Sequence, residues 1–251
     1  MTKKSVSNHQ QHHKMAIVIG ATGLVGGFLV KQLQASAQYH TIYQIVRHAP
    51  KSKPNVQSEN SEIKSNIKNI VVPDFAHLDQ ALVNLDLTDA DAFSTLGTTL
   101  KQAGGKDAFK QVDFTYNLKF AELVKQKGAR QFLLLSATGA DANSFIFYNK
   151  VKGQLEDAVK QIGFEQLSVF HPSLLIGEHS DKRMLEGIGQ QVFNAAKSLL
   201  PPTWAYRPIE AERVAQAMCM VANQLPTHTA KSNTRTYSNA DLLQLTLENP
   251  A

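Results

Sequence analysis

Three side chains that could exchange a proton with a substrate are Ser136, Tyr148 and Lys152. Tyr148 and Lys152 are four residues apart at the start of a predicted helix, 148–163, so they share one face of it. A phenol in water ionises only at about pH 10, and a neighbouring ammonium favours the phenolate. A serine hydroxyl can hold the oxygen atom of a substrate. Together these groups indicate acid–base catalysis at a carbonyl or an alcohol.

The spacing of Tyr148 and Lys152 is common by chance, so its meaning depends on where the two residues lie in the fold. Ser136 ends a predicted strand, 130–137, and precedes Tyr148 by twelve residues. In open α/β sheets, ligands bind outside the carboxyl ends of the strands. If this strand is parallel to its neighbours, the three side chains can converge at that edge.

A glycine-rich turn lies in the sequence IVIGATGLVGG, residues 17–27, between a predicted strand and a predicted helix. Gly20 permits a tight turn, Gly23 lets the backbone approach a diphosphate, and Gly26 lets the helix pack against the strand. The amino end of the helix offers free N–H groups to the anion. We therefore predict a dinucleotide site here, which also includes Thr22, Leu24 and Val25.

The second predicted strand, 41–47, ends at Arg47 and is followed by His48. Sites specific for NAD usually carry an acidic residue at this point, and the strand offers none. Arg47 and His48 instead suit a 2′-phosphate, through charge-assisted hydrogen bonds. We expect NADP(H) as the cofactor, with NAD(H) as the alternative if Arg47 points into solvent.

Strand-like and helix-like segments alternate from residue 15 to about residue 177. This alternation predicts an α/β fold, a Rossmann-type doubly wound parallel sheet with helices on both faces. We expect a single NAD(P)-binding domain over 15–251, in which 178–251 forms a small C-terminal helical lobe for substrate or partner. The predicted strands are 15–20, 41–47, 69–75, 91–97, 130–137 and 165–177, and the main predicted helices are 24–37, 78–85, 112–128, 148–163, 184–200 and 210–225.

Composition narrows the class of protein. The chain has 251 residues, a net charge of +5 and one cysteine, Cys219. The basic residues are dispersed without interleaved aromatic residues, so we do not expect nucleic-acid binding.

Residues 1–14 contain neither a signal peptide nor a membrane span, and we expect a flexible tail there and a cytoplasmic protein. We predict no metal site, although His9, His12 and His13 could form one. Residues 49–66 read as a long polar loop.

The sequence resembles the short-chain dehydrogenase/reductase superfamily, in particular its atypical single-domain branch. It looks closest to the Tat-interacting protein subgroup and to bacterial relatives described as nucleoside-diphosphate-sugar epimerase-like. The resemblance covers residues 15 to about 177 and continues more weakly at 208–209. The segments that carry it, in order, are GATGLVG, VRH, DF at Asp74–Phe75, LGTT at 96–99, VD at 112–113, LLLSATGAD, YNKVKG and SVFHPSLLIG.

The resemblance implies roles for further residues. Asp74 and Phe75 would border the adenine, and Lys152 would also bond the nicotinamide ribose. The segment 96–98 would face the cofactor through its backbone, with Leu96, Gly97 and Thr98. The segment 171–173 takes the place of the family's usual Arg-Pro-Gly beside the nicotinamide, with His171, Pro172 and Ser173. Ser136 and Tyr148 would also contact the cofactor.

The sequence departs from the family pattern at two further positions. Many members have a serine pair where this chain has Ser136 and Ala137, so Ser136 or Thr138 must take the serine role, or the role is absent. Where extended relatives have a supporting asparagine, this chain has Asp113. Asn117 is a candidate substitute one turn on, and Asp113 could simply cap its helix.

Two functions fit the sequence. The first is an NADP-dependent short-chain oxidoreductase that acts on an unidentified carbonyl or alcohol. The second is an NADPH-binding regulatory or interaction protein with little turnover, for which the helices 184–200 and 210–225 would offer a partner surface. The intact Tyr148–Lys152 pair favours the enzyme, whereas the missing second serine favours the regulator. A sugar-nucleotide epimerase fits less well, because the segment after residue 177 is short for a nucleotide-sugar lobe.

Overall fold

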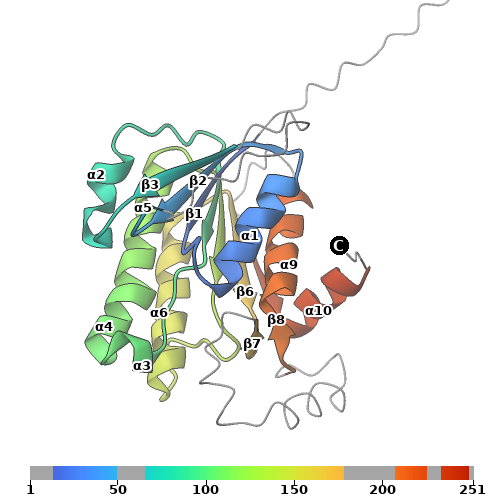
Figure 1. Ribbon diagram of the computed structural model, residues 1–251. Helices are drawn as coiled ribbons and strands as arrows, with labels where there is room; N and C mark the ends of the chain where they lie inside the picture. Colours follow the sequence, from blue (N-terminus) through green and yellow to red (C-terminus); the bar gives the residue numbers. More distant parts are fainter. Residues whose placement is uncertain (1–13, 50–65, 178–206, 225–232, 249–251) are drawn as a thin grey trace, which may run out of the picture.

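The computed structural model describes residues 14–49, 66–177, 207–224 and 233–248 (Figure 1). Its main sheet has seven strands in the order β3-β2-β1-β4-β5-β6-β9, and every neighbouring pair is parallel. The strand order reverses direction between β1 and β4, as in a doubly wound fold. The strands are β1 Lys14–Ile19, β2 Tyr39–Val46, β3 Ile67–Val71, β4 Asp91–Ser94, β5 Gln131–Leu135, β6 Gln166–His171 and β9 Asn233–Ser238.

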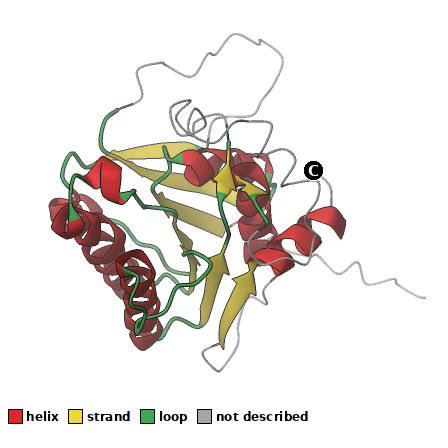
Figure 2. Ribbon diagram, turned by 90° about the horizontal axis from the view of Figure 1, so that it is seen from below, coloured by secondary structure: helices red, strands yellow, loops and turns green. Residues whose placement is uncertain are grey.

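Helices cover both faces of the sheet, so the molecule has three layers (Figures 1 and 2). On one face, α1 (Leu24–Ala35) packs against α9 (Ala211–Gln224) in one hydrophobic core. On the other face, a second core is formed with α2 (Leu78–Leu82), α5 (Asn117–Gln126) and α6 (Phe147–Ile162). The predicted Rossmann-type doubly wound parallel sheet is confirmed.

Two predicted elements have a different form in the structure. The predicted helix 112–128 begins as a π-helix, η2 (Gln111–Tyr116), which follows α4 (Lys106–Lys110) and leads into α5. The predicted strand 165–177 is interrupted at Pro172, which has no N–H to donate to a ladder. Its end forms a separate short strand, β7 (Leu175–Ile176), which pairs with β8 (Ile209–Glu210). The remaining short elements are η1 (Phe75–His77) and α3 (Leu100–Ala103).

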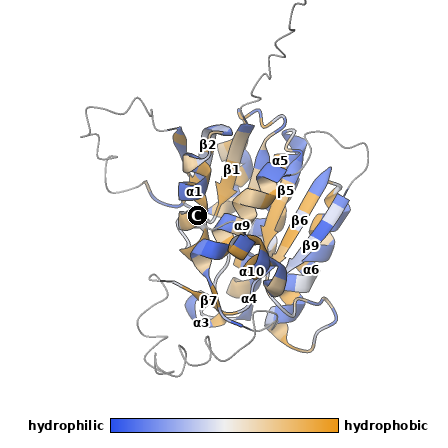
Figure 3. Ribbon diagram, turned by 90° about the vertical axis from the view of Figure 1, so that its right-hand side faces the viewer, coloured by the Kyte–Doolittle hydropathy of each residue, from blue (hydrophilic) through white to orange (hydrophobic). Residues whose placement is uncertain are grey.

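The seventh strand is an element that the sequence pattern did not reveal. β9 adds to the free side of β6 and is followed by α10 (Asn239–Glu248). Five of the six β9 residues are exposed, and Figure 3 shows the strand as mostly hydrophilic beside the more apolar β6. An edge strand of this kind has no apolar run to predict it. Part of the C-terminal region therefore belongs to the sheet itself.

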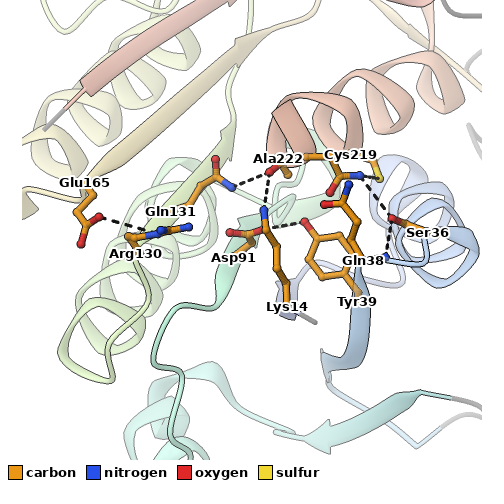
Figure 4. A network of polar contacts seen from close by, with 11 residues as sticks. Lys14, Ser36, Gln38, Tyr39, Asp91, Arg130, Gln131, Glu165, Cys219 and Ala222 are labelled. Carbon is orange, nitrogen blue, oxygen red and sulfur yellow. Dashed lines mark hydrogen bonds and ion pairs between the residues drawn. The ribbon is translucent and has the colours of Figure 1, made fainter. Parts of the chain in front are cut away.

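The amino-terminal edge of the sheet holds a polar network (Figure 4). Tyr39 donates its hydroxyl hydrogen to the buried carboxylate of Asp91 at 2.7 Å. Lys14 lies 3.3 Å from the same carboxylate oxygen and also donates to the Ala222 carbonyl in α9. Burial raises the pKa of Asp91, although the Lys14 charge opposes this effect. The network ties α9 to the sheet at the edge opposite the glycine-rich turn.

Some expectations lie outside the described residues. These are the structure of 1–13 with its three histidines, most of the loop 49–66, and the helix 184–200. Among the described residues, no helix is long and apolar enough to cross a bilayer, and no group of three or more potential metal ligands occurs.

Candidate functional site

The glycine-rich turn connects β1 to α1 at the carboxyl edge of the sheet. Gly20 has a φ of 79°, a left-handed conformation that favours glycine. A Cβ on Gly26 would lie 2.1 Å from the Gly20 carbonyl oxygen, so the third glycine allows the close packing expected of it. A Cβ on Gly23 would meet only that same oxygen, at 3.1 Å. The backbone conformation and the packing of the turn therefore require glycine at positions 20 and 26. At position 23, a side chain would have open space apart from the Gly20 oxygen.

The amino end of α1 is open to an anion. Gly23 is the N-cap, no side chain caps the helix, and its first turn contains no acidic residue. Thr22 and Gly23 are exposed, Leu24 is half-buried and Val25 is buried in the core. Free N–H groups at the positive end of a twelve-residue helix suit a diphosphate. The residues present fit the predicted dinucleotide.

The ends of β2 and β3 supply the residues predicted for the adenosine half. Arg47 and His48 are exposed directly after β2. Asp74 caps η1 by accepting from the Ala76 N–H at 2.9 Å, and this hydrogen bond contributes most to lowering its pKa. Phe75 is buried and makes an edge-on contact with Tyr116, with ring centroids 5.8 Å apart.

Tyr116 is a site neighbour that the sequence analysis did not single out. Its hydroxyl lies 3.2 Å from Asp74 Oδ1, so it contacts both members of the predicted adenine border. It comes from η2, forty-two residues away along the chain. The one signal in the sequence that could have pointed to Tyr116 is its aromatic side chain in the helical segment just before α5.

Tyr148 and Lys152 lie in the first turns of α6, at the same edge of the sheet. Tyr148 is half-buried, and its ring packs against Phe109 with centroids 5.6 Å apart. The Lys152 ammonium lies 2.7 Å from Asp113 Oδ1, and both side chains are buried. Asp113 thus pairs with Lys152 rather than capping a helix. Asn117 instead donates to the Leu96 and Val112 carbonyls and accepts from Ser94.

The loop after β4, predicted to face the cofactor, lies beside this ion pair. The Thr98 N–H donates to Asp113 Oδ2 at 2.8 Å. A Cβ on Gly97 would lie 3.3 Å from Asp113 Oδ1 and 3.7 Å from Lys152 Nζ. Leu96 is half-buried and packs on the second hydrophobic core, which anchors the start of the loop.

Ser136 is buried at the end of β5, and its hydroxyl donates to Glu156 Oε1. The same oxygen lies 2.8 Å from His171 Nε2 at the end of β6. Thr138, the alternative to Ser136, donates its hydroxyl hydrogen to the His171 carbonyl at 2.9 Å. Both candidate hydroxyls therefore have acceptors within the protein. Glu156 was not anticipated, although it lies one helical turn after Lys152.

The segment after His171 is held by the C-terminal region. Pro172 is buried, and its carbonyl accepts from the Thr138 N–H. The Ser173 N–H donates to the buried Asn239 side chain at 3.0 Å, and the Ser173 hydroxyl donates to the Arg207 carbonyl. Asn239 begins α10, so the segment predicted to border the nicotinamide is tied to an element that the sequence pattern did not reveal.

Comparison with known proteins identifies the family. The chain is 30% identical over 232 residues to the protein FMP52, mitochondrial, of Lodderomyces elongisporus, covering 91% of this chain and 95% of that protein. It is 33% identical over 196 residues to HTATIP2 of Rattus norvegicus, covering 78% and 75% of the two chains. The chain belongs to the FMP52/HTATIP2 family of atypical short-chain dehydrogenases/reductases. No protein-family model matches it.

Solved structures support the fold of this family member. An oxidoreductase of the short-chain dehydrogenase/reductase family from Burkholderia thailandensis superposes with a TM-score of 0.64 at 18% identity, covering 94% of this chain and 98% of that one. MoeE5 in complex with UDP-glucuronic acid and NAD superposes with a TM-score of 0.60 at 13% identity, covering 94% and 82%. The expected cytoplasmic location is contradicted, because several fungal members of the family are named mitochondrial.

Proposed function

We propose that the protein is an NADP(H)-dependent oxidoreductase of the short-chain type that acts on a small carbonyl or alcohol. The observation that carries the proposal is one sheet edge with two features. The open amino end of α1 follows β1, and the Tyr148–Lys152 face of α6 follows β5. Because all strands of the sheet are parallel, the proposed anion site and the proposed acid–base pair lie at the edge where ligands of such folds bind.

Each residue has a distinct task in this proposal. The glycine-rich turn holds a diphosphate, and the exposed Arg47 binds a 2′-phosphate. Tyr148 exchanges a proton with the substrate oxygen, while Lys152 stands one helical turn away with its positive charge. A bound nicotinamide would supply or accept the hydride. We further propose that 15–251 acts as one domain, to which 178–251 contributes a small lobe for substrate or partner.

A second candidate function has an observation of its own. The Ser136 hydrogen is used on Glu156 and the Thr138 hydrogen on the His171 carbonyl, so neither hydroxyl is free to donate to a substrate oxygen in this arrangement. This supports an NADPH-binding regulator that binds a protein partner and turns over little substrate.

One experiment separates the two candidates. NADPH binding is measured by calorimetry, and NADPH oxidation is followed at 340 nm, a wavelength that reports the reduced nicotinamide, with a broad panel of aldehydes and ketones. The oxidoreductase proposal expects both binding and turnover with at least one carbonyl class. Tight binding with no turnover across the panel would favour the regulator, and an absence of NADPH binding would refute both.

A further inference from the structure

A buried carboxylate that the proposed chemistry does not use stands next to Lys152. Asp113 is 1% exposed, and its Oδ1 lies 2.7 Å from the Lys152 ammonium, whose side chain is 6% exposed. An ion pair this well buried keeps little hydration, so each charge depends on the other for compensation. Lys152 is therefore held by Asp113.

The second oxygen of Asp113 reaches a different segment. Oδ2 accepts from the Thr98 N–H at 2.8 Å, in the loop between β4 and α3. Gly97 in that loop is the place where the backbone passes the ion pair, since a Cβ there would lie 3.3 Å from Asp113 Oδ1. One carboxylate thus joins three segments: η2, the loop after β4, and α6.

The backbone at Asp113 is itself unusual. The residue lies in a six-residue π-helix, a rare conformation that often occurs at functional sites. A buried carboxylate costs free energy unless it is fully paired. Asp113 is paired through both oxygens, with the lysine of the proposed acid–base pair and with the backbone of the proposed cofactor loop.

We infer that Asp113 is a positioning residue for Lys152, which locks the ammonium to the loop 96–98 and so sets where Lys152 can meet a bound cofactor. The inference rests on the proposed function for the ligand that Lys152 meets. Asp113 itself is too deeply buried to contact that ligand. Its effect on binding must therefore act through the two groups that it holds, Lys152 and the loop 96–98, and removing Lys152 separates the two.

The test is a double-mutant cycle on NADPH affinity, measured by calorimetry with Asp113→Asn, Lys152→Met and the double variant. Asparagine keeps the shape and, with its oxygen toward Thr98, the acceptor for that N–H. Its amide N–H₂ then faces Lys152, so both the charge and the acceptor that hold the ammonium are removed. We expect Asp113→Asn to weaken NADPH binding roughly tenfold, because the ion pair that holds the Lys152 ammonium is lost. In the Lys152→Met background the same change should have no further effect. Asp107→Asn, an exposed charge on the neighbouring α4, is the matched control and should leave affinity unchanged.

Equal effects of Asp113→Asn with and without Lys152 would overturn the inference, as would wild-type affinity in Asp113→Asn. If Asp113→Asn does not fold, Asp113→Glu keeps the charge but displaces it, and it should weaken NADPH binding only when Lys152 is present.

Urea unfolding without cofactor keeps this test separate from the proposed function. We expect each single variant to lower the unfolding midpoint, and the double variant to lose less than the two single losses combined, because no unpaired charge remains. If the wild-type protein binds no NADPH, the proposed function fails, but the urea-unfolding cycle still measures the coupling between Asp113 and Lys152. Coupling in stability without coupling in NADPH affinity would make Asp113 merely structural and overturn its positioning role.

Discussion

The carbonyl oxygen of Gly20 lies 2.1 Å from the point where a side chain on Gly26 would begin. Gly26→Ala must therefore push α1 away from the turn. We expect a loss of about 1–3 kcal/mol in the free energy of unfolding, the usual range for overpacking. Urea denaturation measures it. A Gly26→Ala variant as stable as the wild type would mean that the turn opens without cost.

Gly23 provides the contrasting case. Its φ of −74° is accessible to any residue, so Gly23→Val should leave the fold intact. The branched side chain would occupy the space proposed for the diphosphate, and NADPH and NADH affinity should both be lost. Calorimetry on protein with a wild-type circular dichroism spectrum makes the comparison. Tight binding by folded Gly23→Val would show that the diphosphate lies elsewhere.

Arg47 is predicted to distinguish NADPH from NADH. Arg47→Ala removes charge-assisted hydrogen bonds to a 2′-phosphate, and it should weaken NADPH by roughly 10- to 100-fold while leaving NADH unchanged. Lys31→Ala, an exposed positive charge on α1, is the control for a general effect of charge. Equal losses for both cofactors would mean that Arg47 does not read the 2′-phosphate.

Tyr148→Phe removes only the hydroxyl at the proposed site of proton transfer. Positioned acid–base catalysis typically contributes about 10²- to 10⁴-fold, so turnover should fall by that factor. NADPH affinity should change little, because the ring still packs on Phe109 and Lys152 remains. Tyr43→Phe in β2 is the control. If Tyr148→Phe retains full activity, the proposed cofactor site would still stand, but the proposed proton transfer by Tyr148 would be wrong.

The stability of the protein should fall in alkaline solution. Burial, followed by the Asp91 charge, raises the pKa of Tyr39 well above its ordinary value, and burial raises the pKa of the Cys219 thiol to about 11. In the unfolded chain these groups lose their protons at about pH 8.5–10, whereas the folded protein retains them. The unfolded state then binds fewer protons, so the free energy of unfolding decreases as the pH rises through this window.

Tyr39→Phe tests this assignment. The variant should be less stable at pH 8 by about 1–2 kcal/mol, because Asp91 loses a buried hydrogen bond. Between about pH 9 and 10.5 the stability of the variant should then decline less than that of the wild type. This is roughly the range in which a free phenol begins to ionise. Urea unfolding at several pH values measures both effects, and Tyr43→Phe should keep the wild-type slope. Identical slopes for Tyr39→Phe and the wild type would exclude Tyr39 as the source.

Local sequence was enough to predict much of the fold. Glycine spacing depends on the backbone of a single turn, and both the left-handed φ of Gly20 and the tight contact at Gly26 follow from it. The alternation of apolar strands and amphipathic helices reflects burial on both faces of a parallel sheet, so it can be recognised in a single sequence. The four-residue spacing of Tyr148 and Lys152 likewise places both on one face of α6.

Only the tertiary structure decided which partners these residues have. Asp113 reaches Lys152 from thirty-nine residues away and Glu156 reaches Ser136 from twenty, and no periodic pattern specifies either pair. The sequence did not predict β9 for a related reason. A polar edge strand is defined by its hydrogen bonds to β6 rather than by a run of apolar residues. Residue type and helical or strand period are local properties of the chain, whereas the pairing of buried charges and of strand edges depends on packing between distant segments.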